Sequence, residues 1–406
     1  MSSRKRLGQA LLCLVLGASC LVLGASVAGA QPAPWQPERL TPGWTFTPAL
    51  GFGGLWDSNS TLRVTGDPLI GQWVGIVNPR GELDFNGRRT RFTAGYSGSL
   101  EAYQELAELT RYDQRGRVIA RFQSTPRLQF TGTAGLSVSP TTERIDLAGL
   151  PFENVGTTQF TTRAGANYAV TQRTTFAAEY DFQLVEFDNT DTFSPTVLSG
   201  GHGHGGTATL RHAINSRVET GGAYSYRIAF TGADRQRVNI HDAMAIVQVR
   251  LAENTSFNGG AGIARLDLRE TGESRTGPSL RASISHGLQR ARVELAYDRS
   301  YIPSWSFGGT TTNEQIRGSV SVPLMSGRMS VAADIAFRHN EPLLSQPNPL
   351  VLDSWSTGGN ISYAIARWIR VEGFYSASFQ DSSARGEVDR TRVGVQFITF
   401  KPVRIE

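Results

Sequence analysis

The chain has 406 residues, with 40 Lys or Arg against 35 Asp or Glu and only 18% charged residues. Soluble domains average about 25% charged residues. The near balance of charge offers no broad basic surface for nucleic acid. Beyond the N-terminal segment no stretch approaches the ~18 apolar residues that a membrane helix needs, which excludes a helical membrane protein.

The N-terminal residues have the pattern of a secretory signal peptide. Three cations at positions 4–6 precede an apolar stretch over 11–27 and an Ala-Gly-Ala sequence at 28–30. We therefore expect a signal peptide over 1–30, a short periplasmic segment over 31–43 and one barrel domain over 44–406. A transmembrane anchor and a lipoprotein signal at Cys20 are the alternatives; Gly17 stands where a lipobox needs a large aliphatic residue. The two cysteines, Cys13 and Cys20, fall inside the signal, so a disulfide, a Cys-based zinc site or a Cys nucleophile is excluded from the mature chain.

The remaining sequence alternates apolar and polar residues. Apolar residues occupy every second position over 92–100, 128–138, 176–184, 243–251, 329–337 and 369–379. Such a two-residue period predicts β-strands with one apolar and one polar face. We count about 18 such segments of roughly 10–14 residues, longer than globular strands and long enough to cross a bilayer at a ~45° tilt.

The connections between these segments alternate in length. Short turns lie near 86–88, 125–127, 171–173, 214–216, 252–254, 288–290, 325–327 and 366–367. Longer loops lie near 58–72, 104–116, 140–157, 188–200, 231–236, 268–274, 304–311, 340–352 and 381–387. Short periplasmic turns and long outer loops are typical of a bacterial outer-membrane barrel. The sequence therefore predicts an all-β chain: a single transmembrane antiparallel barrel of about 18 strands (16–20) with an open, polar lumen and both ends in the periplasm.

Aromatic residues near the predicted strand ends would form interfacial girdles, with loop-edge packing as the alternative. They are Trp44, Trp56, Trp73, Tyr103, Tyr168, Tyr301, Trp305, Trp355, Tyr363 and Trp368.

The polar face of the strands predicts a set of charged side chains that line the pore. The set comprises Arg121, Arg163, Glu179, Asp181, Arg211, Arg281, Arg292, Glu294, Arg317, Asp334, Arg370, Glu372 and Arg392. The alternative is that these charges pair across neighbouring strands and only stabilise the inner wall. Among the long loops, 140–157 is the best candidate for folding inward as a constriction.

The sequence contains little that indicates a catalytic or a metal-binding site. His202 and His204 could share a metal, but no third ligand is adjacent, and a glycine-rich loop at a strand start is the favoured interpretation. No nucleophile motif accompanies His212, His241, His286 or His339, so we expect no enzyme, no catalytic residue, no metal and no cofactor.

Two segments resemble a known family. Residues 54–59, Gly-Leu-Trp-Asp-Ser-Asn, and the terminal strand pattern over 392–400 are similar to the β-barrel porin type 2 group, which includes barrels associated with exopolysaccharide. The resemblance implies an outer-membrane channel for a secreted polysaccharide. The alternatives are a general small-solute porin, a structural or adhesive barrel with a blocked lumen and, least favoured, an enzyme. Expected partners are outer-membrane lipid and lipopolysaccharide, with polysaccharide export machinery as a further candidate; the chain would be a monomer or a porin-like trimer that binds no nucleic acid.

Overall fold

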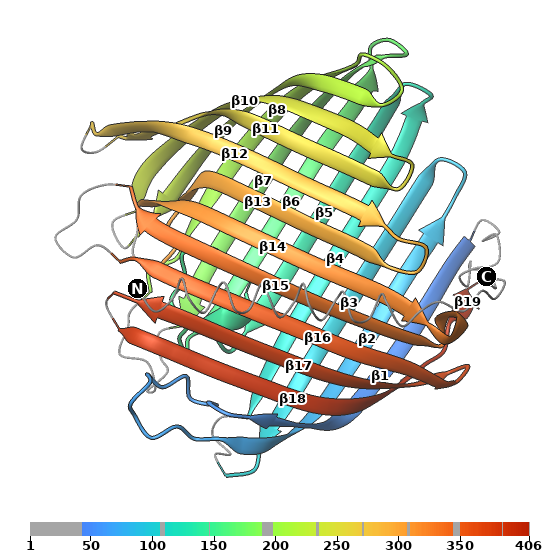
Figure 1. Cartoon of the computed structure of the whole chain (residues 1–406), viewed down its shortest axis with the longest axis vertical. Coiled ribbons are helices and arrows are strands. Elements are labelled where there is room, and N and C mark those ends of the chain that lie inside the picture. Colours follow the sequence, from blue (N-terminus) through green and yellow to red (C-terminus); the bar gives the residue numbers. More distant parts are fainter. Residues whose placement is uncertain are drawn as a thin grey trace.

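The computed structural model describes residues 43–105, 110–145, 147–188, 198–232, 235–269, 272–306, 309–343, 350–383 and 385–405, and the predicted signal peptide lies outside them. Eighteen long antiparallel strands follow one another around the barrel (Figure 1). Their bounds are β1 (Gly43–Asp57), β2 (Gln72–Asn86), β3 (Thr90–Tyr103), β4 (Arg111–Thr125), β5 (Leu128–Ser139), β6 (Gly156–Ala169), β7 (Thr174–Asp188), β8 (Gly201–Ala213), β9 (Val218–Thr231), β10 (Gln236–Ala252), β11 (Thr255–Leu268), β12 (Ser274–Gly287), β13 (Arg292–Pro303), β14 (Thr310–Leu324), β15 (Met329–Pro342), β16 (Leu352–Ala366), β17 (Ile369–Ser382) and β18 (Gly386–Phe400). Within the described residues, two short 3-10 segments, η2 (Thr142–Arg144) and η3 (Met325–Gly327), lie in connections.

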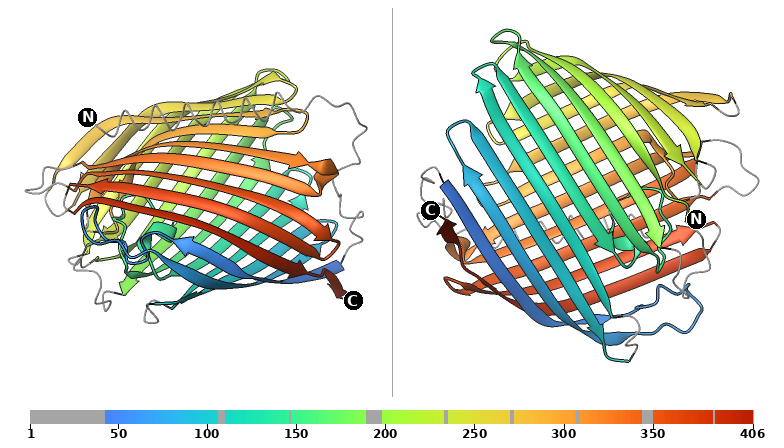
Figure 2. Two further views of the ribbon diagram at one scale, coloured as in Figure 1. Left: turned by 60° about the horizontal axis from the view of Figure 1, so that its bottom comes forward. Right: turned by 180° about the vertical axis from the view of Figure 1, so that it is seen from behind.

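The sheet closes on itself through its first and last long strands. β1 pairs with β18 from Ala49↔Phe400 to Asp57↔Arg392, which leaves no open edge on either strand. Beyond Phe400 a short strand β19 (Val403–Ile405) pairs with residues 44–46 of β1. Figure 2 shows the strands of the two opposite walls crossing, as the tilt of a closed barrel requires. The predicted 18-stranded barrel is confirmed.

The two faces of the wall follow the predicted alternation. Phe52, Leu210 and Ile263 belong to outward rows of exposed apolar side chains. Such a surface is what a barrel presents to lipid. No helix in the described ranges is long and apolar enough to cross a membrane.

In three of the short turns a side-chain oxygen accepts hydrogen bonds from backbone N–H groups that would otherwise be unpaired. Thr125 Oγ1 accepts hydrogen bonds from the N–H groups of residues 127 and 128, and Thr171 Oγ1 accepts them from residues 173 and 174. Asn215 Oδ1 does the same for residues 217 and 218. A side-chain oxygen three residues before the next strand thus fixes each of these three turns. The long connections also fall near their predicted positions, except that β4 already begins at Arg111 and shortens the predicted 104–116 loop.

The prediction of an open, polar lumen is wrong at the loop end of the barrel. There the inward rows of β7, β10 and β11 carry Val185, Val238, Ile240, Leu266 and Leu268, all buried in one apolar cluster. Loop residues pack against this cluster from inside, namely Ile145, Leu147, Leu150, Trp305 and Leu343. The lumen is therefore occupied by loops at one end.

Three of the residues assigned to aromatic girdles are buried instead. Tyr103 packs in a small inner cluster with Leu55 and Val74. Trp305 and Tyr301 belong to the apolar cluster described above. Other members of the set, such as Trp44, Trp73, Tyr168 and Tyr363, are exposed.

Candidate functional site

The connection between β5 and β6 crosses the lumen. The Gly149 N–H donates to Asn340 Oδ1 of β15 at 3.1 Å, and the Phe152 N–H donates to Gln380 Oε1 of β17 at 2.7 Å. Gln380 in turn donates its amide to the Leu150 carbonyl at 2.9 Å. β15 and β17 lie on the wall opposite β5 and β6 (Figure 2). The loop predicted to fold inward, 140–157, therefore does so; we call its described residues between the strands, 140–145 and 147–155, the crossing loop.

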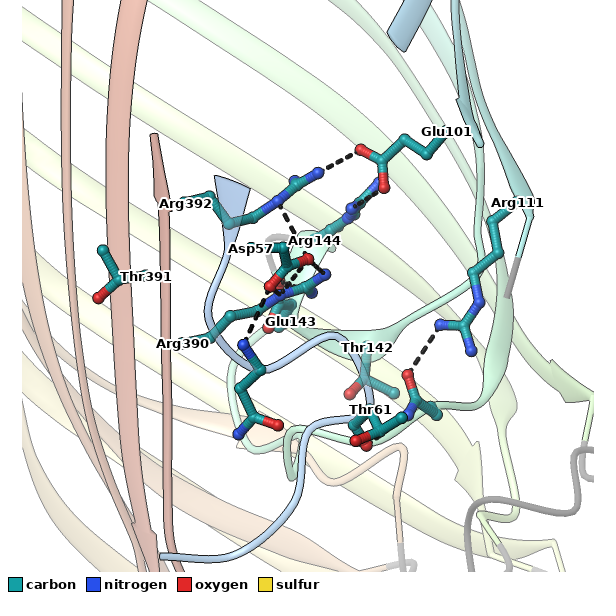
Figure 3. A network of polar contacts seen from close by, with 12 residues as sticks. Asp57, Thr61, Glu101, Arg111, Thr142, Glu143, Arg144, Arg390, Thr391 and Arg392 are labelled. Carbon is teal, nitrogen blue, oxygen red and sulfur yellow. Dashed lines mark hydrogen bonds and ion pairs between the residues drawn. The ribbon is translucent and has the colours of Figure 1, made fainter. Parts of the chain in front are cut away.

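An arginine of the last strand ties the crossing loop to the first strand. The Arg390 guanidinium contacts Asp57 Oδ2 at 2.5 Å and Glu143 Oε1 of the loop at 2.5 Å. The Arg390 side chain is 1% exposed and that of Asp57 is fully buried. Figure 3 shows Asp57 held between Arg390 and Arg392. Because a buried charge without a partner is costly, this arrangement fixes the loop end, β1 and β18 relative to one another.

A second ion network joins the loop to β3. Arg144 Nη2 lies 2.6 Å from Glu101 Oε2, and Arg392 bonds the other carboxylate oxygen of Glu101. Burial alone would lower the pKa of the Arg144 guanidinium, but the adjacent Glu101 carboxylate raises that pKa above its usual value. Arg144 therefore stays charged and bound at any physiological pH.

The far part of the crossing loop has its own anchors. Arg385, between β17 and β18, lies 2.6 Å from Glu153 Oε2 and donates to the Phe152 carbonyl at 2.7 Å. Arg111 of β4 donates to Asn154 Oδ1 at 2.8 Å, and Asn154 donates to the Thr61 carbonyl at 2.6 Å. The loop is thus bound at both of its ends and in its middle.

A second loop enters the lumen from β13. Trp305 is 3% exposed and its ring lies against Gly201 and Gly203 of β8, where an added Cβ would come within 3.2 Å and 3.3 Å of the indole. The N–H groups of Ser199 and Gly200 donate to the carbonyls of Ser306 and Trp305 at 2.9 Å each. The inward glycines Gly201 and Gly203 therefore make room for this tryptophan. The 202–206 segment lies in strand β8 and not in the predicted loop.

A cavity of about 480 Å³ remains between the crossing loop and the wall of β13–β17. Its lining carries both charge signs together with small hydroxyl and amide side chains. Polar members of the lining include Arg144, Glu294, Gln315, Arg317, Ser319, Asp334, Arg338, Asn340, Ser354, Ser356, Ser378 and Gln380.

All thirteen residues predicted to line the pore lie on the inward row. Directly paired residues project to the same side of a sheet, so the registers can be followed around the barrel from Asp57. Only Arg392 belongs to the anchoring networks described above. Whether the other twelve line a conducting passage stays a prediction.

Several of the thirteen also pair across or along strands, as the alternative interpretation proposed. Arg163 lies 3.0 Å from Glu179, and Arg281 lies 3.1 Å from Asp298. Arg227 of β9 lies 3.0 Å from Asp181. These pairs are partly exposed, so each stabilises the wall only weakly and remains accessible to solutes.

His202 and His204 project from the outer surface of β8, away from the lumen. Their ring centroids are 5.9 Å apart, and Tyr180 Oη lies 2.7 Å from His204 Nδ1. Among the described residues, no group of three or more His, Cys, Asp or Glu side chains could hold a metal ion.

Most anchors of the crossing loop were not singled out by the sequence, and Arg392 is the exception. Glu143, Arg144 and Arg390 belong to no motif, and Trp305 was assigned to the wrong surface. One signal was present: Asp57 lies inside the 54–59 segment that carries the family resemblance, and its neighbour Asn59 is buried and donates to the Asp389 carbonyl at 2.8 Å.

A closed barrel whose lumen is crossed by an anchored loop is the architecture that these observations define. No protein-family model matches the chain, and no curated protein sequence matches it. Among solved structures, it is similar to OpdL of Pseudomonas aeruginosa at 11% identity over 89% of this chain and 99% of that chain, with a TM-score of 0.44. It is also similar to OccAB4 of Acinetobacter baumannii at 8% identity over 91% and 100% of the two chains, with a TM-score of 0.45. P. aeruginosa OpdK, solved with vanillate, gives 10% identity over 88% and 99%, with a TM-score of 0.45. The assignment of this chain as an 18-stranded barrel follows from its own strand registers. The resemblance to exopolysaccharide-associated barrels stays a hypothesis.

Proposed function

We propose that this chain is a passive outer-membrane channel for small polar solutes, with the crossing loop as its constriction. The observation that carries the proposal is the loop itself, held across the lumen by buried ion pairs on β1, β3 and β18. A fixed loop reduces the wide passage of an 18-stranded barrel to the spaces beside it.

The size and chemistry of the remaining space favour small solutes. The cavity of about 480 Å³ beside the loop falls within the ~300–1,000 Å³ that small-molecule sites occupy. Its hydroxyl, amide and charged side chains can replace the water bound to a sugar or an amino acid. Export of an exopolysaccharide would require the crossing loop to leave the lumen, so it remains the second candidate.

The proposal is tested by swelling of liposomes that contain the purified barrel. We expect wild-type protein to admit a pentose and to exclude a tetrasaccharide. A variant in which residues 141–154 are replaced by a two-residue turn should admit both. β5 and β6 remain paired up to Ser139↔Thr157, so a short turn can join them.

The matched control is Ile263→Ala, which changes only an outward side chain and should keep the wild-type size limit. Two results would overturn the proposal. If wild-type and loop-trimmed barrels are both tight to all solutes, the chain is a structural barrel with a blocked lumen. If wild-type barrels admit a long polysaccharide, the constriction does not act as proposed.

A further inference from the structure

The outer surface of β8–β11 carries polar and basic side chains where an apolar row would be expected. His202 of β8 lies opposite Phe230 of β9, which lies opposite Arg237 of β10. Nearer the barrel middle, Tyr226 lies opposite His241, which lies opposite Arg265 of β11. With His204, these histidines and arginines form what we call the basic outer patch: His202, His204, Arg237, His241 and Arg265.

The patch begins directly above the apolar surface of the barrel. The row below it contains Tyr224, Ala243 and Ile263, which lie opposite one another on β9, β10 and β11. Ile263 is 63% exposed and Tyr224 is 49% exposed, as expected for side chains that face lipid. His241 and Arg265 are two residues further along their strands, which is about 7 Å.

The strand length places the patch at the level of lipid headgroups. A 14-residue strand is about 46 Å long, and a tilt near 40° leaves about 35 Å along the barrel axis. The apolar band of an outer-membrane barrel is only about 25 Å tall, so the strand ends project beyond it. Transfer of an arginine side chain into the hydrocarbon layer costs several kcal/mol of free energy. Arg237 and Arg265 are therefore expected to lie above that layer, among the headgroups.

The side chains of the patch are held in place by aromatic neighbours. His241 packs against Tyr226 with ring centroids 4.6 Å apart in a tilted arrangement, and its Nδ1 lies 2.8 Å from Tyr224 Oη. His202 stacks on Phe230 at 4.9 Å. Arg237 Nε donates to Asn239 Oδ1 at 3.3 Å, and Arg265 lies 3.0 Å from Asp267. Rings and short-range bonds thus orient nitrogen donors on one exposed surface.

The rim over β16–β18 has the opposite charge. Across β16, β17 and β18 the outward residues Asp353, Asp381 and Glu387 lie directly opposite one another. On β14, Glu314 is paired with Arg299 at 2.8 Å. An anionic group at headgroup level would therefore be repelled along β16–β18 and attracted to β8–β11.

We propose that the basic outer patch is a binding site for the phosphate groups of a phosphorylated lipid in the outer leaflet. The charge complementarity and the position just above the apolar row select a membrane-anchored phosphate. Guanidinium groups bind phosphate oxygens through paired N–H donors, and the histidines and tyrosines add further donors. The lipid's acyl chains would lie along the row of Tyr224 and Ile263. This site faces lipid, so its occupation is independent of passage through the lumen.

The test is native mass spectrometry of the full mature chain in detergent, with diphosphoryl lipid A as the probe and the same lipid without phosphates as comparison. We expect the wild-type barrel to retain the phosphorylated lipid and to bind the dephosphorylated one far more weakly. Arg237→Gln/Arg265→Gln should weaken retention about thirtyfold, since each cation near a membrane surface contributes about fivefold. Asp353→Asn/Asp381→Asn is the matched control on the acidic side and should bind like wild type.

A heat-dependent shift in gel migration verifies that each variant is folded. Should the arginine variant not fold, His204→Gln/His241→Gln removes donors from the same patch and should also weaken retention. Equal retention by wild type and the patch variants would overturn the proposal. So would an equal loss in the acidic-side control, or retention of a second copy of the chain in place of the lipid.

Discussion

Removing one carboxylate of the crossing loop should release the loop from the lumen. Glu143→Gln changes only the loop side of the contact and leaves Arg390 paired with Asp57. The lost bond joins Arg390 Nη1 to Glu143 Oε1 at 2.5 Å, and Glu143 is largely buried. Hydrogen bonds to charged groups contribute about 1.5–3 kcal/mol, so a loss of about 2 kcal/mol should raise the undocked fraction of the loop roughly thirtyfold.

Single-channel recording in planar bilayers measures this equilibrium directly. An undocked loop widens the passage, so we expect Glu143→Gln channels to spend about thirty times longer in a state of higher conductance than wild-type channels. Glu341→Gln is the control, because that carboxylate is 66% exposed and 3.9 Å from His339 on the outer surface. Such an exposed pair contributes at most about 1 kcal/mol and does not touch the loop.

A double-mutant cycle with Arg390→Gln separates the contact from its surroundings. If the two residues act through one another, the double variant should open less than the sum of the single effects, with a coupling near 2 kcal/mol. The reasoning is refuted if folded Glu143→Gln channels show the wild-type distribution of conductance states. It is also refuted if Glu341→Gln changes that distribution equally.

Three further substitutions test the second loop and the inner wall. Gly203→Leu should push Trp305 out of its position, because even a Cβ would lie 3.3 Å from the indole. Limited proteolysis should then cut the loop between β13 and β14 faster than in the wild type. An unchanged rate of cleavage would contradict this prediction. Trp305→Ala empties the same buried position and should destabilise the docked loop by about 3–5 kcal/mol. The measurement is the denaturant concentration at which half of the protection of this loop against proteolysis is lost. An unchanged concentration would show that the tryptophan does not hold the loop. Arg121→Glu should shift ion selectivity toward cations, because Arg121 faces the lumen directly opposite Arg91; an unchanged reversal potential in a salt gradient would place it outside the conducting passage.

The barrel could be predicted from the sequence because its determinants are local. A strand reveals its two faces through a two-residue period, and a hairpin turn occupies only a few residues. The side-chain oxygens of Thr125, Thr171 and Asn215 mark three such turns and bond within three residues of themselves. Strand number and the parity of loops follow from counting these features.

The anchors of the crossing loop could not be found in the same way, because the contacts join distant parts of the chain. Glu143 and Arg390 are 247 residues apart, and Phe152 and Gln380 are 228 apart. No period relates such positions. Trp305 illustrates a second difficulty: an aromatic residue at the end of a strand can face lipid or fold into the lumen, and only the path of its loop decides between them.

The apolar cluster inside the lumen did leave a signal, in the phase of the alternation. On β10 the odd, outward positions carry Arg237, Asn239 and His241 near the loop end, and only apolar residues from Ala243 to Leu251. The even, inward positions carry Val238 and Ile240 at the loop end and Gln248 and Arg250 at the other end, with Asp242, Met244 and Ile246 between them. Since side-chain direction alternates strictly, the outside of the wall becomes apolar at Ala243, and the inside becomes polar from Gln248 onward.

This change along β10 relates the constriction in the lumen to the basic outer patch on the opposite side of the same wall. Where the outside of the wall is apolar, the barrel faces lipid and the lumen keeps polar side chains such as Gln248. Where the inside is apolar, Val238 and Ile240 pack the inserted loops, and the outside can carry Arg237 and His241 among headgroups. A shift of β10 by one residue would expose the loop cluster to solvent on one side and place charges in hydrocarbon on the other. The register of β10 therefore fixes both the constriction and the height of the barrel in the membrane.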